Sequence, residues 1–290
     1  MILDYVRLFL PILCICSSRW FIAGQVYDPD TTYNVTQLVQ SKGYPCENHR
    51  VITQDGYILG LFRIPYGRNS TRLLGSNKPV LLQHGLLDSA ATWVINLPEQ
   101  SLGFMLADTG YDVWLGNMRG NVYSRAHVKY NPEVDEAFWD FSWDDMASND
   151  LPSMINYILN MTQQPRLGYV GHSQGTLIAF AEFGRPGNTF HNQVSFYASL
   201  APVAQSGHQK TPLRYLYTDS KELEKYWHQL FGRNEFLPKS NILKWLSKYA
   251  CPNLIFDRLI CENILTCVKK VLAQTKFDFF SITSDIFYVG

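Results

Sequence analysis

The sequence predicts an α/β fold in which a mostly parallel sheet carries helices on both faces. Short apolar runs suited to buried strands alternate with helical patterns from residue 79 to residue 200, and this alternation is typical of a doubly wound sheet. A Gly-His-Ser-Gln-Gly turn at residues 171–175 joins one such run directly to a helical pattern. The length of 290 residues fits one large α/β domain or two smaller ones.

The predicted strands are β-prone or apolar runs bounded by turn residues. Asp55-Gly56 between two β-prone runs is a strong signal for a hairpin. A polar loop at residues 68–77 separates this hairpin from the next strand. In chain order, the predicted strands are residues 51–53, 57–62, 79–83, 111–115, 167–170 and 194–200.

Helical patterns fill the segments between these strands. Ser142 followed by Asp145 is a capping pattern. It begins a helix that reaches about Leu159, and Pro152 is expected to bend this helix. The other predicted helices are residues 104–109, ended by Gly110, residues 176–183, and a helical insertion beyond Gln205 that is rich in Trp and Leu.

The turn at residues 171–175 has the G-x-S-x-G pattern between a strand and a helix, which is the nucleophile elbow of α/β-hydrolases. Ser173 is expected to occupy a strained backbone conformation that presents its Oγ, so we predict that it is a nucleophile. Gly171 and Gly175 are expected because strand and helix approach too closely for side chains at these positions. The helix that begins behind Ser173 offers N–H groups to an oxyanion.

A second turn, His84-Gly85-Leu86, follows the strand at residues 79–83, where hydrolases of this type place another oxyanion donor. The backbone N–H groups of Leu86 and Gln174 are therefore the predicted oxyanion hole. His84 is expected to be a hydrogen-bonded scaffold residue rather than a base. His172 is expected to face away from the hydroxyl of its neighbour.

Composition and the N-terminal segment bound the cellular context. The 25 basic and 25 acidic side chains cancel, so nothing favours a nucleic acid as partner. An apolar run at residues 8–16, too short to span a bilayer, predicts a signal peptide over residues 1–24, with a retained anchor as the alternative. No other apolar run is long enough to be a transmembrane segment. On the secretory route, the glycosylation sequons at Asn34, Asn69 and Asn160 become usable.

The cysteines indicate one disulfide. Cys251 and Cys261 flank a short helical pattern and are the best pair. Cys46 and Cys267 are left either free or paired, and the sequence alone does not decide between these states.

Several motifs resemble the acid lipases, a family of α/β-hydrolases that includes gastric and lysosomal lipases. The motifs are Gly43-Tyr44-Pro45, Asp55-Gly56-Tyr57-Ile58-Leu59, residues 63–67, 82–87 and 110–117, Asp150-Leu151-Pro152 and residues 171–176. The helical insertion resembles the lysosomal type most, and the pair Cys251 and Cys261 falls where the family has its cap disulfide. The resemblance implies hydrolysis of triacylglycerols or cholesteryl esters at a lipid interface, a cap over the acyl chains, no metal and no organic cofactor. It also implies a lysosomal or extracellular location, and it leaves the oligomeric state open.

The acid and the base of the triad have no counterpart in this sequence. In the family's fold they follow the nucleophile in the order Ser, Asp or Glu, His. The histidines after Ser173 are His191, His208 and His228, all before or inside the helical insertion. Asp219 with His228 fits a solvated helix surface, and the later acids Asp257, Asp278 and Asp285 have no histidine after them.

The predicted domains are therefore a signal peptide at 1–24, the N-terminal part of an α/β-hydrolase core at 25–204, a helical cap at 205–270 and a divergent tail at 271–290. On this interpretation the chain stops inside the cap, and the C-terminal part of the core is missing. Three functional hypotheses remain. The first is a lipase in an incomplete form, the second is a catalytically inactive lipid-binding protein, and the third is a small-ester esterase or acyltransferase on the same fold.

Overall fold

The structure, a computed structural model, describes residues 29–68, 78–187 and 190–204. The chain divides into two compact units, residues 1–33 and 34–290. In the first unit the described part holds a short 3-10 helix, η2 (Pro29–Thr32). Every element described below belongs to the second unit. The predicted signal peptide, cap and tail, and with them Asn69, Cys251, Cys261 and Cys267, lie outside the described residues.

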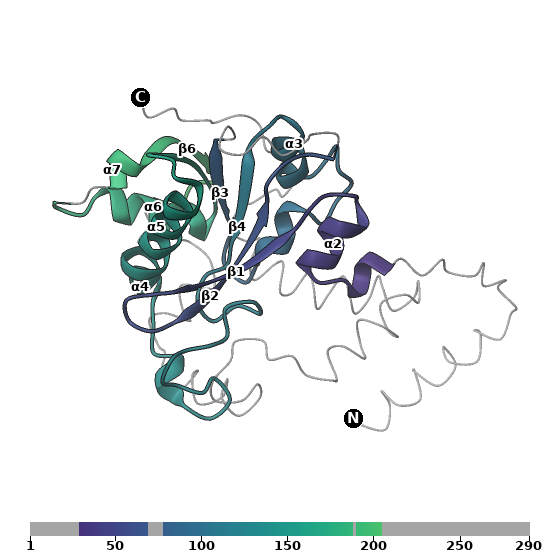
Figure 1. Ribbon diagram of the computed structural model, residues 1–290. Helices are drawn as coiled ribbons and strands as arrows, with labels where there is room; N and C mark the ends of the chain where they lie inside the picture. The colour runs from purple at the N-terminus through teal and green to yellow at the C-terminus, as the bar shows by residue number, and fades with distance from the viewer. Residues whose placement is uncertain (1–28, 69–77, 188–189, 205–290) are drawn as a thin grey trace, which may run out of the picture. The chain divides into compact units, whose positions relative to one another are not determined.

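The second unit contains a six-stranded sheet with the order β1-β2-β4-β3-β5-β6 (Figure 1). The hairpin strands are antiparallel to each other, and β2 is antiparallel to β4, whereas β3 pairs in parallel with β4 and β5, and β5 pairs in parallel with β6. The bounds are β1 (Glu47–Ile52), β2 (Ile58–Ile64), β3 (Pro79–Gln83), β4 (Asp112–Gly116), β5 (Leu167–His172) and β6 (Val194–Leu200). This mostly parallel sheet confirms the predicted fold class.

Helices cover the sheet from two sides, with α5 and α6 on one side and α2 and α3 on the other (Figure 1). The helices are α2 (Val35–Ser41), α3 (Leu102–Asp108), α4 (Trp143–Asp145), α5 (Leu151–Thr162), α6 (Gln174–Phe183) and α7 (Phe190–Gln193). Short 3-10 turns η3 (Ala90–Trp93) and η4 (Glu136–Phe138) lie in the connections. The largest fully buried side chains include Trp114 on β4, Tyr169 on β5 and Phe104 on α3, so the sheet lies at the centre of the core.

The register of the parallel strands brings together the three segments that follow β3, β4 and β5, at the carboxyl ends of these strands. Gln83 at the end of β3 pairs with Gly116 at the end of β4 and with Gly171 near the end of β5. The carboxyl ends of these strands therefore lie side by side, which is where open α/β sheets bind ligands. The segments that follow them begin with His84, Asn117 and Ser173.

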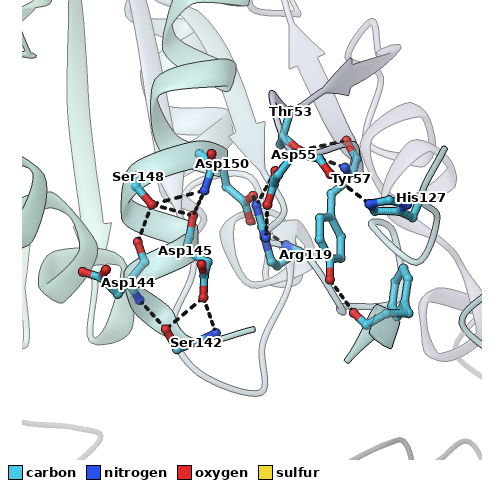
Figure 2. A network of polar contacts seen from close by, with 12 residues as sticks. Thr53, Asp55, Tyr57, Arg119, His127, Ser142, Asp144, Asp145, Ser148 and Asp150 are labelled. Carbon is cyan, nitrogen blue, oxygen red and sulfur yellow. Dashed lines mark hydrogen bonds and ion pairs between the residues drawn. The ribbon is translucent and has the colours of Figure 1, made fainter. Parts of the chain in front are cut away.

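The helix predicted from Ser142 forms, but it is not one continuous α-helix. Ser142 makes the predicted capping box with Asp145 (Figure 2). A π-helical turn, η5 (Met146–Asp150), then precedes α5, and Pro152 lies in the first turn of α5. A proline has no N–H to donate and crowds the carbonyl four residues earlier. Pro152 is tolerated because it stands at the start of α5, where the missing N–H costs least. The π turn before it is wider than an α-helical turn and accommodates the proline ring.

A buried arginine joins three separate segments near this turn (Figure 2). Arg119 donates from its backbone N–H and from Nε to Asp150, at 2.9 and 2.8 Å. The same guanidinium donates two bonds to Asp55 in the hairpin turn, at 2.7 and 3.0 Å. Its centre lies 4.0 Å from the ring centroid of Tyr57. Arg119 therefore fixes the hairpin turn, the segment after β4 and the π turn to one another.

The pKa values within this cluster show competition between burial and pairing. Burial opposes the charge of Arg119, but the hydrogen bonds that Arg119 donates to both carboxylates outweigh it, and the pKa of Arg119 is raised. Burial raises the pKa of Asp150 to about 6 despite the hydrogen bonds from Arg119. With these pKa values, Arg119 and Asp150 are both ionised at neutral pH. The several donors of Arg119 favour this ionised state of Asp150.

The exposures of the two carboxylates predict unequal contributions to stability. The side chain of Asp150 is 0% exposed, and that of Asp55 is 36% exposed. Asp150→Ala leaves part of a buried guanidinium unpaired, and we expect a loss of about 3–5 kcal/mol in the free energy of unfolding. Asp55→Ala is expected to lose about 1 kcal/mol, since water reaches that position. Urea unfolding of both variants measures the difference, and equal losses would contradict this account.

Candidate active site

Ser173 stands between β5 and α6 in a backbone conformation that a non-glycine residue rarely adopts. Its φ is 50° and its ψ is −110°, so the predicted strain is confirmed. Its N–H donates to the carbonyl of Leu200 at the end of β6, at 2.9 Å, and its carbonyl accepts from the N–H of Thr176, also at 2.9 Å. The residue is half-buried. Its hydroxyl makes no hydrogen bond with any residue that the structure describes.

The two glycines of the turn are required by close backbone approach, as predicted. A Cβ at Gly171 would lie 2.7 Å from the carbonyl oxygen of Gly175, across the corner between strand and helix. A Cβ at Gly175 would lie 2.6 Å from the carbonyl oxygen of Gln83, at the end of β3. The first contact confirms the expected crowding of strand and helix. The second shows that α6 also packs against the neighbouring strand, which the sequence did not indicate.

The turn after β3 packs directly against Ser173. A Cβ at Gly85 would lie 3.1 Å from the Cβ of Ser173, tighter than most real Cβ contacts, so the backbone at Gly85 packs closely against Ser173. This contact places Leu86, the next residue, beside the elbow. Neither the N–H of Leu86 nor that of Gln174 has a hydrogen-bond acceptor among the described residues. An oxyanion hole requires backbone donors that are not already bonded, and both amides meet this requirement within the described residues.

Leu87 adds a strained position that the sequence does not reveal. Its φ is 59°, in the left-handed region that leucine seldom occupies. The side chains of Leu86 and Leu87 are 54% and 46% exposed. An apolar rim therefore lies on the segment that follows β3. Turn residues such as Gly or Asn would have signalled the positive φ, but leucine carries no such signal.

His84 is fully engaged in hydrogen bonds, as expected of a scaffold residue. Its Nδ1 lies 2.7 Å from the carbonyl oxygen of Gly85. Its Nε2 accepts from the N–H of Met118 at 3.2 Å and lies 3.0 Å from Nδ2 of Asn121. Burial lowers the pKa of His84, so the imidazole is neutral. Burial also lowers the pKa of His172, the last residue of β5.

The Asn residues that follow β4 are functional candidates that sequence reasoning missed. Asn117 is fully buried, and its Oδ1 accepts from the N–H of Ala90 at 2.9 Å. Asn121 donates to that same Oδ1 at 2.9 Å. The segment after β3 is therefore held at His84 and again at Ala90 by one turn after β4. The Gly-Asn pair at residues 116–117 was the available signal, since asparagine favours turns.

Other predicted residues lie away from this site or carry no chemistry there. Asn34 is exposed and caps α2, and Asn160 is exposed on α5. His191 on α7 lies before β6, at the opposite end of the sheet from Ser173, because β5 and β6 run parallel from Leu167 and Val194. Cys46 is a free thiol, and burial raises its pKa to about 11. His208 and His228 lie outside the described residues, as do Asp219, Asp257, Asp278 and Asp285.

Searches for two other kinds of site gave negative results within the described ranges. No group of three or more His, Cys, Asp or Glu side chains there is arranged to hold a metal ion. No helix within the same ranges combines the length and the apolar character needed to cross a bilayer.

Comparison with known proteins identifies two overlapping family matches. Residues 35–97 match a family described as a partial alpha/beta-hydrolase lipase region, and residues 78–211 match the alpha/beta hydrolase fold. The chain is 44% identical over 255 residues to gastric triacylglycerol lipase of Rattus norvegicus, covering 87% of this chain and 63% of that protein.

Two further relatives extend this result. Gastric triacylglycerol lipase of Mus musculus is 41% identical over 272 residues, covering 90% of this chain and 67% of the relative. Lipase member M of Homo sapiens is 44% identical over 239 residues, covering 82% of this chain and 55% of the relative. The chain thus spans between about half and two thirds of the length of these relatives.

The close approach at Gly175 gives a test of the elbow's packing. Gly175→Ala places a methyl group against the carbonyl of Gln83, and we expect a loss of about 1–3 kcal/mol in the free energy of unfolding. Gly184→Ala is the matched control, because its Cβ would have its nearest contact at an ordinary 3.4 Å. We expect this control to unfold as the parent does. Denaturant unfolding measures both, and a Gly175→Ala protein of unchanged stability would contradict the packing described.

Proposed function

The chain belongs to the acid lipase family of α/β-hydrolases, and from this membership we propose that it is a serine ester hydrolase of neutral lipids. Ser173 is the nucleophile, and the backbone N–H groups of Leu86 and Gln174 form the oxyanion hole. One observation carries the proposal: a hydroxyl with no described hydrogen-bond partner stands on a strained corner against which Gly85 packs, and the amides that follow Gly85 and Ser173 have no acceptor among the described residues.

The reaction follows from this geometry. Oγ of Ser173 forms a bond to the acyl carbon and gives its proton to a base, while the carbonyl oxygen becomes an oxyanion held by the two amides. The oxyanion collapses, the ester C–O bond breaks, and the alcohol leaves with a proton. Water then attacks the acyl-enzyme by the same route and releases the fatty acid. No step calls for a metal or an organic cofactor.

A neutral lipid ester is the substrate class that the surroundings support. The exposed side chains of Leu86 and Leu87 lie on the segment that carries the oxyanion donor, and they offer apolar contact to an acyl chain. Two of the relatives are named triacylglycerol lipases. Triacylglycerol or cholesteryl ester at a lipid interface is therefore the proposed substrate, with a location on the secretory route, in the lysosome or outside the cell.

The proton acceptor is the part of the reaction that no hydrogen bond identifies, since none joins the Ser173 hydroxyl to a histidine among the described residues. Both ring nitrogens of His84 are engaged. His191 lies past the far end of β5, whose six residues span roughly 20 Å at about 3.3 Å per residue. Loss of a triad base lowers the rate by several orders of magnitude. Free imidazole in solution can replace such a base if the rest of the site is intact.

This reasoning gives a test of the nucleophile. Release of butyric acid from tributyrin, an alkyl ester that imidazole alone hardly attacks, is measured with and without imidazole for the 290-residue chain and for Ser173→Ala, after subtraction of the rate without protein. We expect the parent rate to exceed that of Ser173→Ala by at least about 100-fold once imidazole is present. Ser195→Ala is the matched control, because Ser195 lies on β6 and its Oγ donates to the carbonyl of Leu167, at the end of the sheet away from the elbow.

The outcomes separate the functional hypotheses. A rate that depends on Ser173 without imidazole supports the proposal and places a base within the 290 residues. A rate that depends on Ser173 only with imidazole supports the proposal without an internal base. Equal rates for the parent and Ser173→Ala in both conditions contradict it, and binding of triolein emulsion by such a protein would favour a lipid-binding role. Acyl transfer to an added alcohol in preference to water would favour an acyltransferase.

A further inference from the structure

We propose that His84 is a positioning residue that aims the N–H of Leu86 at the developing oxyanion, by holding the peptide group that Gly85 and Leu86 share. The inference rests on the proposed function, since it concerns one donor of the same oxyanion hole. It assigns to a buried histidine a role that is neither proton transfer nor general support of the fold. Three sets of contacts carry it.

The hydrogen-bond partners of His84 determine its tautomer. The N–H of Met118 can only donate, so Nε2 of His84 must be the unprotonated nitrogen that accepts from it at 3.2 Å. The carbonyl of Gly85 can only accept, so Nδ1 must carry the proton that bridges the 2.7 Å to this oxygen. The two immobile backbone partners therefore agree on one neutral imidazole, with its proton on Nδ1.

The bond from Nδ1 controls the oxyanion donor because a peptide group is rigid. The carbonyl of Gly85 and the N–H of Leu86 belong to one planar unit, and the described residues contain no cis peptide bond. In a trans peptide the C=O and N–H point in opposite directions. A donor that fixes the Gly85 carbonyl on one side therefore fixes the direction of the Leu86 N–H on the other.

Free rotation of this peptide is otherwise easy. Gly85 has no side chain, and a Cβ there would crowd the Cβ of Ser173 at 3.1 Å. Glycine leaves the adjoining dihedral angles unrestricted. The two exposed leucines that follow do not anchor the segment through side-chain burial. The hydrogen bond from His84 supplies the restraint that the missing side chain cannot.

The turn after β4 holds His84 itself in place. Oδ1 of Asn121 accepts from the N–H groups of Tyr123 and Ser124, at 2.9 and 3.1 Å. These bonds settle the orientation of the Asn121 amide, so its Nδ2 donates toward Nε2 of His84 at 3.0 Å. The imidazole is thus fixed by two donors on one nitrogen while it donates from the other.

The experiment compares His84→Ala with His84→Asn in the 290-residue chain, under the imidazole conditions above. Asparagine carries its amide nitrogen on Cγ, as histidine carries Nδ1, so His84→Asn keeps a donor for the Gly85 carbonyl. We expect His84→Ala to lower kcat roughly 10- to 100-fold at unchanged KM, since complete removal of one oxyanion donor costs about 100- to 1,000-fold and a misdirected donor costs less. We expect His84→Asn to recover at least half of the loss on a logarithmic scale.

His127 offers a matched control far from the elbow in sequence and contacts. Its Nε2 lies 3.0 Å from the carbonyl oxygen of Asp55, and its Nδ1 accepts from the N–H groups of Lys129 and Tyr130. It is therefore a histidine with the same kind of bonds but the opposite tautomer. His127→Ala is expected to keep the parent kcat. In ¹⁵N-histidine spectra of the parent, we expect His84 protonated on Nδ1 and His127 protonated on Nε2.

A readout without turnover makes the result independent of the proposed function. The ¹⁵N NMR order parameter of the Leu86 amide reports the fast motion of its peptide, and we expect it to fall from about 0.85 in the parent to below about 0.6 in His84→Ala and to be largely restored in His84→Asn. Equal kcat in His84→Ala and the parent, or His84→Asn as impaired as His84→Ala while both melt as folded proteins, overturns the inference. So does a proton on Nε2 of His84. Rates that do not depend on Ser173, with the expected order parameters and tautomer, overturn the proposed function and leave the restraint on the Leu86 peptide standing.

Discussion

The geometry of the site depends on how closely three backbone segments approach one another: the end of β5 with Ser173, the start of α6, and the end of β3 with the turn that follows it. The carbonyl of Gly175 lies against Gly171, the carbonyl of Gln83 lies against Gly175, and Gly85 lies against Ser173. A Cβ at Gly171 or Gly175 would lie closer to these carbonyl oxygens than real Cβ atoms do, and a Cβ at Gly85 would be crowded by Ser173. Because these close contacts restrict the backbone on both sides of Ser173, they hold it in its strained conformation at φ 50°. Its hydroxyl is therefore presented by packing rather than by hydrogen bonds of its own.

Much of this arrangement follows from the sequence, because short-range chemistry determines it. The strand at residues 79–83 and the one at residues 194–200 agree residue for residue with β3 and β6, since both are apolar runs bounded by turns or loops. The helix from Ser142 was only partly right, because the sequence signals of its cap and its proline do not state how the intervening turn adjusts. The cap, the disulfide and the signal peptide stay predictions, since they fall outside the described residues.

Long-range pairing explains what the sequence could not reveal. Arg119 reaches Asp55, 64 positions away, and Asp150, 31 positions away, and no local pattern marks an arginine for burial. The ion pair between Arg119 and Asp150 adds little to the net free energy of folding, because the cost of removing two charges from water offsets most of their attraction. It contributes more to the specificity of the fold. Its effect is to leave one arrangement in which the hairpin turn and the segment after β4 fit together. That segment is the one that carries Asn117 and Asn121.

The same segment decides what kind of electrostatics the site can use. A charged His84 would bring a positive charge near the oxyanion, but it would also turn Nε2 into a donor facing the N–H of Met118 and the Nδ2 of Asn121. The N–H of Met118 and Nδ2 of Asn121 would then face a third donor instead of an acceptor, and buried donors without an acceptor are costly. Burial already lowers the pKa of His84 and acts in the same direction. The proposed oxyanion hole would therefore stabilise charge through fixed peptide dipoles, which do not titrate, so His84 and the two amides would add no pH dependence of their own to the acyl transfer.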